Sequence, residues 1–494
     1  MSGKPRHIVF AWPNPSYLRF FEGVVTALRA RGHRVTIARW ADGRDAAALA
    51  RAGTLAALEQ VPAADPAWRP FHETLGELAD YVRFMAPEFA AHPYLRQRMD
   101  KYLPPRFAWL RQRAGCSAIS ARLTYAATRL LEDATPADAG LMAWLARLAP
   151  DVLVISPLVL RGPGGAAQTQ LLKAAAQRGV PSVLTVGSWD HLSSKGLIRV
   201  RPDRVVVWNE TQRTEAVRFH GMPAERVTVT GAYPWDIWFG MKPTVSREQF
   251  LATAGLPVDQ PFVLYAGSSR GIVSPADERA FVRDWVTQLR QRPALARVGV
   301  MIRPHPGNRH WTDAPVDAPG PIAVWPVEPR SLPMTASEQL DYFHSLHYGS
   351  AVVGINTSAM IEAAIVGRPV LTVSGRGGAQ DETIHFAYLT VENGGGVMRS
   401  TTFDEHAVQL EQALTDPGPL QAAAARFVRD FVRPFGDMTA GVPLCVAAIE
   451  TAAGDAALTS SRHSGHPPVW LAPVRAAARM AARRLSSPTD GRRP

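Results

Sequence analysis

Short, mostly apolar runs alternate with longer amphipathic stretches along most of the chain. His7 to Trp12 is one such run, and Ser16 to Arg31 then repeats apolar residues every three or four positions before Gly32. The first pattern predicts a buried strand, and the second predicts a helix that ends at a glycine. Arg34 to Ala38 follows at once as another strand. The chain therefore opens with a βαβ unit, which implies a parallel sheet.

The same alternation continues in two series. Residues from about 43 to 135 interrupt the first series, with helical spacing and little strand character, and predict a helical elaboration. The first series predicts strands at 151–155, 181–186, 204–208 and 227–230, with helices at 166–179 and 210–220. The second predicts strands at 261–266, 298–303, 322–325, 351–355 and 369–373, with a helix at 277–290.

A chain of 494 residues is too long for one ordinary core, so two series of α/β units predict two doubly wound domains. The best linker between them is 231–243, which is rich in Pro, Gly and Trp. The predicted organisation is an N-terminal Rossmann-like domain at 1–235, a C-terminal Rossmann-like domain at 236–434, a helix at 435–453 and a basic, largely disordered tail at 454–494.

The net charge of +11 and the pI near 10.0 favour anionic or phosphorylated partners. A good part of the excess lies at the C-terminal end, where from Arg475 onward six arginines face only Asp490. No zinc-finger spacing or RNP-type aromatic pattern accompanies the charge, so nucleic acid is not the expected partner. Cys116 and Cys445 stand far apart and without neighbouring ligands, so we expect neither a disulfide framework nor a zinc site.

The N-terminal residues run directly into a strand pattern, and no run of 18 apolar residues occurs, so we expect neither a leader peptide nor a spanning helix. A cytoplasmic location follows as the expectation. In the tail, Trp470, Val474, Met480 and Leu485 stand among arginines. They allow a basic helix in peripheral contact with the inner membrane face, or a solvated tail.

The first candidate for chemistry follows the strand at 298–303. Arg303 is its last residue, and His305 comes next between Pro304 and Pro306. Ligands collect at the carboxyl ends of strands in open α/β sheets, so both side chains are expected at a binding edge. The imidazole could donate a hydrogen bond to a phosphate or protonate a leaving oxygen. The alternative is a loop histidine held between prolines for turn geometry alone.

The second candidate joins a strand to a helix through Asn356, Thr357 and Ser358. Free backbone N–H groups at a helix start favour phosphate, and Glu362 stands one turn later, where a ribose diol could reach it. A Thr-Ser pair followed by Glu is also how many helices cap themselves. Both interpretations stay open from the residues alone.

Two further segments fall at the same predicted edge of the sheet. Gly267, Ser268, Ser269 and Arg270 form a turn able to approach a pyrophosphate, although such turns also merely connect strand to helix. The segment 375–386, with several glycines and His385, follows the strand at 369–373. The convergence of four segments strengthens each of them as a candidate.

These motifs resemble a known group. His-Pro after a strand, and Thr-Ser opening a later helix, are similar to the paired motifs of bacterial polysialyltransferases and of the CDP-glycerol glycerophosphotransferase and capsule-polysaccharide transferase group. Residues 354–370 resemble the donor-binding stretch of GT-B glycosyltransferases in general, and 27–35 resemble their first helix and second strand. The loop at 12–16 departs from the pattern, because it lacks the glycine-rich turn of the lipid-linked sugar transferases.

The resemblance implies a GT-B-type α/β fold, with two Rossmann-like domains facing across a cleft. It implies a nucleotide sugar donor in the C-terminal domain, with His305 and Ser358 at its phosphates and Glu362 at its ribose. The acceptor is then expected against the N-terminal domain. No Asp-x-Asp occurs, so neither a metal nor another cofactor is expected, and the leaving group would depend on the helix dipole, His and Arg.

An inverting transfer needs a base for the acceptor hydroxyl. Asp190 is the candidate, in a loop after the strand at 181–186, with Glu22 and Asp236 as weaker alternatives. A turn-forming role for Asp190 is equally compatible with its position. The predicted acceptor or sugar contacts are Asn14, Ser188, His191, Lys195 and His385.

The resulting hypothesis is a metal-independent glycosyltransferase that moves a sugar from a nucleotide donor to a hydroxyl of a glycan or another acceptor, in surface glycan or glycoconjugate biosynthesis. Three alternatives stay open: a nucleotide-sugar 2-epimerase, a CDP-glycerol-type phosphotransferase, and a non-catalytic carbohydrate-binding or nucleotide-binding protein. Polar residues crowded at both predicted binding edges argue against the last of these.

Overall fold

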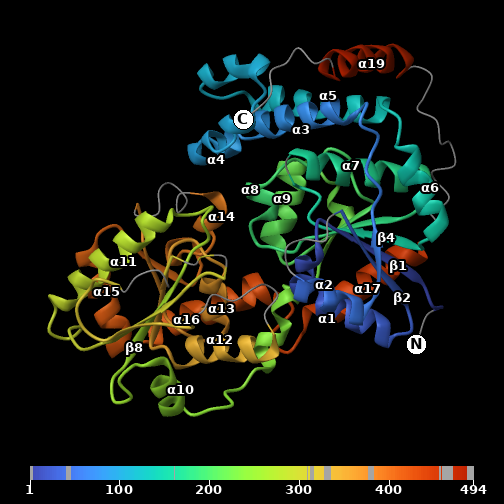
Figure 1. Ribbon diagram of the computed structural model, residues 1–494. Coiled ribbons are helices and arrows are strands. Elements are labelled where there is room, and N and C mark those ends of the chain that lie inside the picture. The colour runs from blue at the N-terminus through green and yellow to red at the C-terminus, as the bar shows by residue number, and fades with distance from the viewer. Residues whose placement is uncertain are drawn as a thin grey trace. The chain divides into compact units, whose positions relative to one another are not determined.

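The computed structural model describes residues 4–40, 46–160, 162–306, 308, 310–311, 316–327, 335–375, 383–455, 458 and 471–486. The chain divides into two compact units (Figure 1). Unit 1 combines Met1–Pro234 with Ala440–Pro494, and unit 2 is Trp235–Thr439. The boundary between Pro234 and Trp235 falls inside the segment expected to be the linker.

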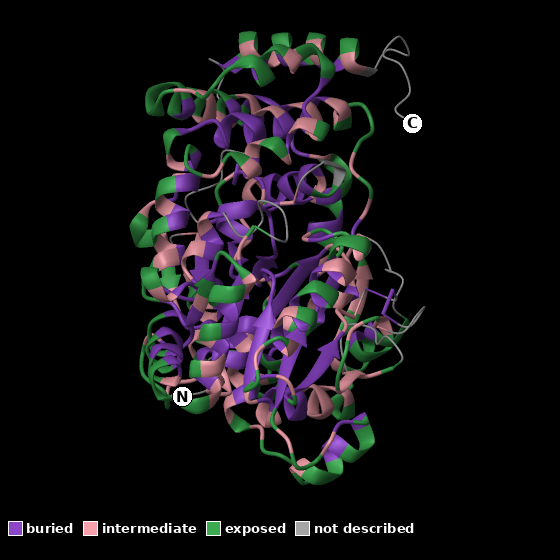
Figure 2. Cartoon of the chain, turned by 90° about the vertical axis from the view of Figure 1, so that its left-hand side faces the viewer, coloured by how far each residue is buried: buried purple, intermediate pink, exposed green. Residues whose placement is uncertain are grey.

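Unit 1 is built on a sheet of seven parallel strands in the order β3-β2-β1-β4-β5-β6-β7. The central strands are buried along their whole length and appear purple in Figure 2. Continuous apolar runs form such strands because helices cover both faces of a parallel sheet. The strands are β1 (His7–Trp12), β2 (Arg34–Arg39), β3 (Ala57–Gln60), β4 (Val152–Ile155), β5 (Ser182–Thr185), β6 (Arg204–Val207) and β7 (Val227–Val229).

Helix α1 (Leu18–Ala30) shows how the pattern of the sequence determines packing in unit 1. It buries Leu18, Phe21, Val25 and Leu28, which are spaced to share one face, and the chain then turns at Gly32 with φ of 86°. The other helices around this sheet are α2 (Ala46–Leu55), α6 (Ala139–Leu148), α7 (Gly162–Gln177), α8 (His191–Ser194), α9 (Glu210–His220) and α17 (Gly441–Gly454), besides α1 itself (Leu18–Ala30).

The predicted helical elaboration consists of α3 (Arg69–Arg83), α4 (Pro93–Gln97) and α5 (Ala118–Ala134), with the 3-10 helix η4 (Pro105–Gln112) before α5. One part of the chain was predicted differently. The tail was expected to be largely disordered, but Ala472–Ser486 forms helix α19, which packs on α3 and α5. Ala478 and Ala482, four residues apart, give this helix a small apolar face. The overall composition of the tail did not indicate this face.

Unit 2 contains six parallel strands in the order β10-β9-β8-β11-β12-β13. They are β8 (Phe262–Ala266), β9 (Gly299–Arg303), β10 (Ile322–Val324), β11 (Ala351–Gly354), β12 (Val370–Val373) and β13 (Val397–Ser400). The helices are α10 (Arg247–Ala254), α11 (Pro275–Arg290), α12 (Ala336–Tyr348), α13 (Ala359–Ile365), α14 (Ile384–Ala387), α15 (Phe403–Thr415) and α16 (Gly418–Phe427).

Both sheets have the doubly wound topology, because their first six strands run in the same spatial order with helices on both faces. The predicted fold class is confirmed. Each unit has a core of its own, around Leu153 and Val205 in unit 1 and around Val300 and Trp285 in unit 2. Within the described ranges, every helix is too short or too polar to span a membrane.

Candidate functional site

The predicted binding segments of unit 2 lie at the carboxyl edge of its sheet. The strand order reverses between β8 and β11, which makes this pair the switch point where ligands bind in open α/β sheets. Gly267 follows β8, Asn356 comes soon after β11, and His305 follows the neighbouring strand β9. The parallel topology therefore brings three of the four predicted segments to one edge. Residues 376–382 of the fourth lie outside the described part of the chain.

Gly267 and the backbone of His305 approach each other closely. The Gly267 N–H donates to the carbonyl of Arg303 over 2.9 Å. A Cβ on Gly267 would lie 2.9 Å from the His305 nitrogen and 3.0 Å from the Arg303 oxygen. A side chain at this position would therefore push the His305 loop away, so glycine is needed here for close approach.

Ser268 is buried and joins three loops. Its hydroxyl donates to the Ile355 carbonyl, and its carbonyl accepts from Asn308 Nδ2 over 2.6 Å. Its N–H donates to Glu278 Oε1 over 2.6 Å. Ser268, expected at the donor, thus has an internal role in the structure. Ser269 is half-buried and Arg270 exposed, so these two can meet a ligand at this edge.

Glu278 supports this turn and was not recognised from the sequence. It is fully buried on α11, where Oε1 also accepts from the Tyr265 hydroxyl over 3.1 Å and Oε2 lies 3.0 Å from His310 Nε2. Burial raises the pKa of Glu278 to about 7, although the Ser268 N–H opposes the shift. An acidic residue in the first turn of a helix resembles an ordinary dipole partner, so the sequence carried no signal for this role.

The raised pKa of Glu278 predicts a pH effect on stability. The folded state favours the protonated carboxyl, so this stabilisation is complete below the unfolded pKa near 4.5 and is lost as pH rises through about 7. Glu278→Gln keeps an acceptor for Ser268 but cannot ionise. We expect it to gain roughly 2–3 kcal/mol relative to the wild type between pH 4.5 and 8, measured by urea unfolding at both pH values. Parallel pH profiles of the two proteins would contradict this account.

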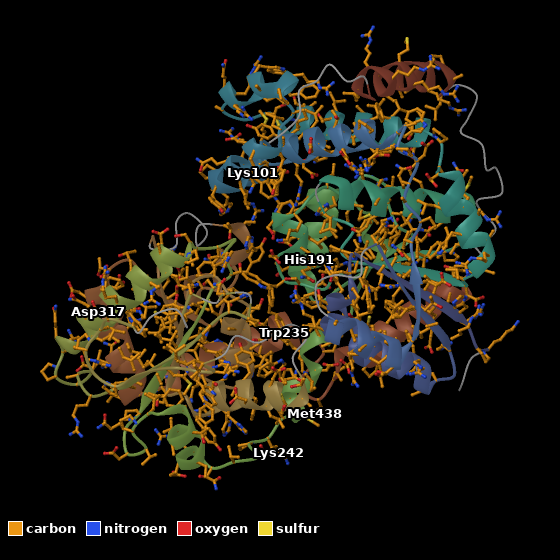
Figure 3. All side chains as sticks on the ribbon, in the orientation of Figure 1. Lys101, His191, Trp235, Lys242, Asp317 and Met438 are labelled. Atoms are coloured by element: carbon orange, nitrogen blue, oxygen red, sulfur yellow. The ribbon has the colours of Figure 1, made fainter. Side chains whose placement is uncertain are left out.

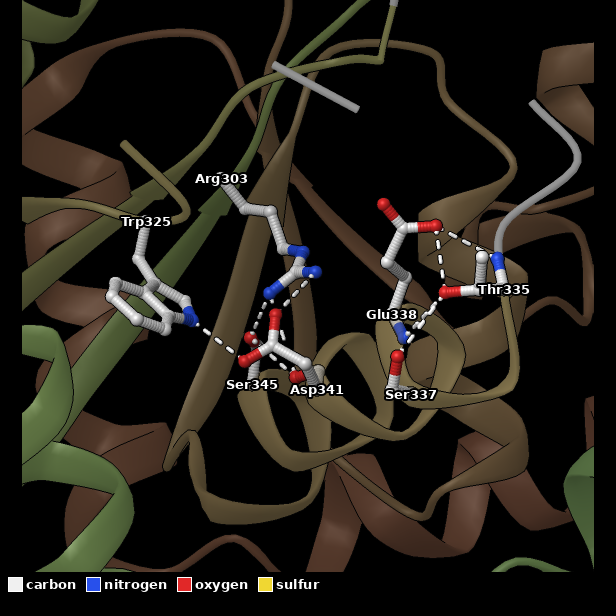
Figure 4. A network of polar contacts seen from close by, with 7 residues as sticks. All are labelled: Arg303, Trp325, Thr335, Ser337, Glu338, Asp341 and Ser345. Atoms are coloured by element: carbon white, nitrogen blue, oxygen red, sulfur yellow. Dashed lines mark hydrogen bonds and ion pairs between the residues drawn. The ribbon is translucent and has the colours of Figure 1, made fainter. Parts of the chain in front are cut away.

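Arg303 is held by helix α12 (Figure 4). Its guanidinium donates to Asp341 Oδ2 over 2.9 Å and to Ser345 Oγ over 2.5 Å. Trp325 Nε1 donates to the other Asp341 oxygen over 2.8 Å, and Arg303 is mostly buried. Arg303, predicted to contact the donor, therefore has an ion-pair partner within the protein. Its structural role is to fix the end of β9 and so the start of the His305 loop.

Glu362 is oriented by two aromatic side chains. The Tyr342 hydroxyl donates to Oε2 over 2.5 Å, and Trp235 Nε1 donates to Oε1 over 3.4 Å. Burial, followed by the charge of Glu362, raises the pKa of Tyr342, so the phenol stays a donor. A carboxylate oxygen can accept more than one hydrogen bond. Glu362 thus keeps the capacity to receive a hydroxyl of a ligand.

The segment between β11 and α13 has unusual geometry. Asn356 is buried and has φ of 42°, in the left-handed region, which Asn tolerates better than most residues. Thr357 Oγ1 accepts from the Ala359 N–H over 3.4 Å. Ser358 is exposed and its side chain makes no capping hydrogen bond to α13. The capping interpretation of the motif therefore fits Thr357 weakly and does not fit Ser358.

The candidate base of unit 1 lies in a network of its own loop. Asp190 Oδ1 accepts from Ser188 Oγ over 2.7 Å, while Oδ2 accepts from Ser194 Oγ over 2.8 Å and lies 2.9 Å from Lys195 Nζ. Three predicted residues, Ser188, Asp190 and Lys195, are thus in contact. The weaker candidates for the base also have ion-pair partners. Glu22 pairs with Arg51, and Asp236 pairs with Arg433.

The other predicted contacts lie in less accessible places. His191 (Figure 3) is buried with its ring against Phe20, and burial lowers its pKa to about 4, so the ring is neutral at pH 7. Asn14 Oδ1 accepts from the Ser16 N–H over 3.0 Å. His385 is buried, with Nε2 3.0 Å from Thr383 Oγ1. For a sugar to contact His191 or His385, the surrounding side chains would have to move.

Side chains of helix α3 hold the backbone of the Asp190 loop. Asp80 Oδ1 accepts from the Leu197 N–H over 2.6 Å, and Arg83 donates to the carbonyls of Leu192 and Lys195. A Cβ on Gly196 would lie 2.8 Å from Asp80 Oδ2, so the close approach needs glycine. Both charged residues are buried. Sequence patterns could not identify them, because their partners are more than a hundred residues away.

Among the residues that the structure describes, no group of three His, Cys, Asp or Glu side chains is arranged to hold a metal ion. The polar groups described at the two edges are hydroxyls, amides, carboxylates and imidazoles. In unit 2 these are His305, Ser358 and Glu362, and in unit 1 they are the Asp190 network.

Two doubly wound sheets, one in each unit, are the architecture of the GT-B-type fold, the class predicted from the sequence. The chain is similar to a glycosyltransferase from Rickettsia africae, with 9% identity over 92% of this chain and 100% of that one, and a TM-score of 0.51. It is also similar to a structure from Listeria monocytogenes assigned as a UDP-N-acetylglucosamine 2-epimerase, with 11% identity over 90% and 96% of the two chains and a TM-score of 0.52.

A third similar structure is that of S. aureus MnaA with UDP, with 12% identity over 89% of this chain and 95% of that one, and a TM-score of 0.50. At these identities the likeness shows the fold. No protein-family model matches the chain, and no curated protein sequence matches it.

Proposed function

We propose that this protein is a metal-independent glycosyltransferase that moves a sugar from a nucleotide-activated donor to a hydroxyl acceptor. The observation that carries the proposal is the edge of unit 2, where Gly267 brings the His305 loop against the β8 turn and Glu362 is held by Tyr342 and Trp235. A nucleotide sugar has phosphates and a ribose diol to match these groups.

In this proposal His305 and Ser358 bind the donor phosphates, and Glu362 accepts hydrogen bonds from the ribose hydroxyls. A serine hydroxyl can donate a hydrogen bond to a phosphate oxygen. His305 can also protonate the leaving oxygen. Asp190 is the proposed base for the acceptor hydroxyl, and the Ser188 and Lys195 contacts hold its carboxylate in place.

The proposal includes the finer features expected from the sequence: a glycan or other hydroxyl acceptor, a role in surface glycan or glycoconjugate biosynthesis, a cytoplasmic location and a peripheral membrane contact of the tail. Similarity to the polysialyltransferase and CDP-glycerol group also belongs to the proposal. It rests on the His-Pro and Thr-Ser motifs alone.

A panel of UDP, GDP, CMP, CDP and TDP tests donor binding. At least one nucleotide should raise the melting temperature, since a ligand at about 100 times its Kd stabilises a protein by about 2.7 kcal/mol. His305→Ala and Ser358→Ala should each diminish this shift. Thr253→Ala is a matched control, because its exposed hydroxyl donates only to the Gln249 carbonyl within α10. If no nucleotide raises the melting temperature, the donor site is wrong.

A nucleotide-sugar 2-epimerase is the second candidate. The observation that favours it is the state of Asp190, whose two oxygens are both engaged by neighbours in the loop. An epimerase would need no base for an acceptor. Incubating the protein with its preferred nucleotide sugar and no acceptor separates the two candidates. Conversion to the C2 epimer supports the epimerase. If the nucleotide sugar stays unchanged until an acceptor is added and is then consumed, the transferase is supported.

A further inference from the structure

Two segments of unit 1 contain nearly all the excess positive charge of the chain. From Lys101 to Leu131 there are one lysine and five arginines without a single Asp or Glu, and Ala472–Ser486 contains four arginines and again no acid. Together they provide ten positive charges, against a net charge of +11 for the whole chain. The structure brings the two segments together, because α19 packs on α3 and α5 (Figure 1).

The way α19 is attached leaves its arginines outside. Ala478 and Ala482 are buried against Phe71 and Leu75 of α3, and Arg475 Nε donates to the Ala134 carbonyl over 3.2 Å. The opposite side of the helix is exposed, including Met480, which is 59% exposed. The arginines on that exposed side are Arg479, Arg483 and Arg484.

Helix α5 presents an apolar stripe in addition to its charges. Ala121, Thr128 and Glu132 are buried, while Ile119 is 70% and Leu123 is 65% exposed, at a spacing of four residues on one face. Leu130, which is 37% exposed, continues this stripe, and the exposed Arg122 stands beside Leu123. A contiguous stripe of exposed large aliphatic side chains on a helix is typical of a surface that contacts another protein or a membrane.

The chain before α5 also combines exposed cations with an exposed apolar side chain. Trp109 of η4 is 53% exposed, with the Arg113 guanidinium 5.7 Å from its ring centre. Arg106 is exposed nearby in the sequence, and Lys101 (Figure 3) begins the stretch without acids. The acidic neighbours are Asp100, which lies 3.9 Å from Arg111, and the exposed Asp133 near the end of α5. We call the exposed side chains of η4, α5 and α19 the basic face.

We propose that the basic face docks on the surface of an anionic phospholipid bilayer. Cations interleaved with aliphatic and indole side chains match a bilayer interface, where arginines meet lipid phosphates and the apolar side chains enter the acyl boundary. A soluble polyanion would match the arginines but would leave Ile119, Leu123 and Trp109 in water. The proposal goes beyond the donor site and does not depend on it, and it extends the contact from the tail to α5 and η4.

Vesicle co-sedimentation of the full chain tests this proposal. The protein should bind vesicles of phosphatidylcholine with about one third phosphatidylglycerol, should bind pure phosphatidylcholine much less, and should be released at about 0.5 M salt, where charges are screened. The triple variant Arg479→Gln, Arg483→Gln, Arg484→Gln should bind at least about tenfold more weakly, because each arginine near an anionic surface strengthens binding about fivefold.

The matched control removes the same charge elsewhere. Arg283, Arg426 and Arg429 are exposed arginines of unit 2, and replacing all three by Gln should leave vesicle binding as in the wild type. A second variant, Ile119→Ser with Leu123→Ser, should weaken binding at low salt without lowering the melting temperature, since both side chains are exposed.

Three results would overturn the proposal. The first is equal binding to both kinds of vesicle. The second is equal binding by the two triple variants. The third is that the protein does not bind vesicles but binds RNA or forms a dimer through the basic face. In that case the arginine variant or the Ile119 and Leu123 variant would abolish the RNA binding or the dimer.

Discussion

Replacing Glu132 by glutamine should lower the free energy of unfolding by about 3–5 kcal/mol, the cost typical of removing one partner from a buried ion pair. Glu132 of α5 is fully buried, with its carboxylate 3.0 Å from His72 Nδ1, 3.3 Å from Arg199 Nε and 3.7 Å from Lys173 Nζ. After the substitution, the buried Arg199 and Lys173 would lose the carboxylate that lies against them. Urea unfolding at pH 7, followed by circular dichroism, measures the change.

The lowered pKa of Glu132 corresponds to a contribution to stability of similar size. Burial alone would raise it, but His72, Arg199 and Lys173 outweigh burial and hold the pKa at about 2. The lowered pKa contributes stability that is present above the unfolded value near 4.5 and is lost as pH falls towards 2. The difference corresponds to about 3 kcal/mol. The destabilising effect of Glu132→Gln should therefore shrink as the pH is lowered from 5 to 3.

Asp133→Asn provides the control for Glu132→Gln. Asp133 is the next residue on the same helix but is exposed, and burial of part of its carboxyl raises rather than lowers its pKa. Its replacement should change the free energy of unfolding by less than about 1 kcal/mol. If both variants unfold at the same urea concentration, the buried cluster does not hold α3, α5 and α7 together.

The Glu132 cluster also matters for the candidate site, because α3 connects the two. His72 of α3 contacts Glu132, and two to three turns further along the same helix Asp80 and Arg83 hold the backbone of the Asp190 loop. The helical elaboration thus positions the loop that comes after strand β5 of the central sheet. A sequence pattern could predict the helices of the elaboration but not this role, since hydrogen bonds to distant backbone groups leave no periodicity.

The sheets were predictable because their strands are continuous buried runs of Val, Ile, Leu and Phe, each followed by a helix. Two edge strands were missed. β3 has the sequence Ala-Leu-Glu-Gln and β13 has Val-Met-Arg-Ser, and neither shows the β-branched enrichment that marks a strand. Pairing with one neighbouring strand, rather than intrinsic preference, makes these segments extended.

The location of the candidate site could be predicted from the sequence, but the role of each side chain could not. Topology brings Gly267, His305 and Asn356 to one edge, as the positions of the strands implied. Ser268 and Arg303 have the residue types of phosphate ligands, but their partners in the protein, Ile355 and Asp341, lie far away in the sequence. Whether a polar side chain faces a ligand or the core depends on such tertiary contacts.

Gly267→Ala should reduce nucleotide affinity at least about tenfold, the second large effect that we expect, and this prediction rests on the proposed donor site. The new Cβ would lie 2.9 Å from the His305 nitrogen and 3.0 Å from the Arg303 oxygen. Both are backbone atoms that no side-chain rotation can remove, so the His305 loop must shift. Overpacking of this kind costs about 1–3 kcal/mol, and a loss of 1.4 kcal/mol from binding is about tenfold in Kd.

Gly271→Ala is the matched control, since the residue lies in the same loop and its added Cβ would meet only Ser269 Oγ, at an ordinary 3.8 Å. Nucleotide titrations followed by calorimetry should give this variant the affinity of the wild type. Melting without nucleotide separates two kinds of failure. If Gly267→Ala melts lower but binds nucleotide normally, the close approach is structural and the donor does not use the His305 loop. If it matches Gly271→Ala in both measurements, the loop accommodates the methyl group and the geometry of this edge is less restrictive than the 2.9 Å approach indicates.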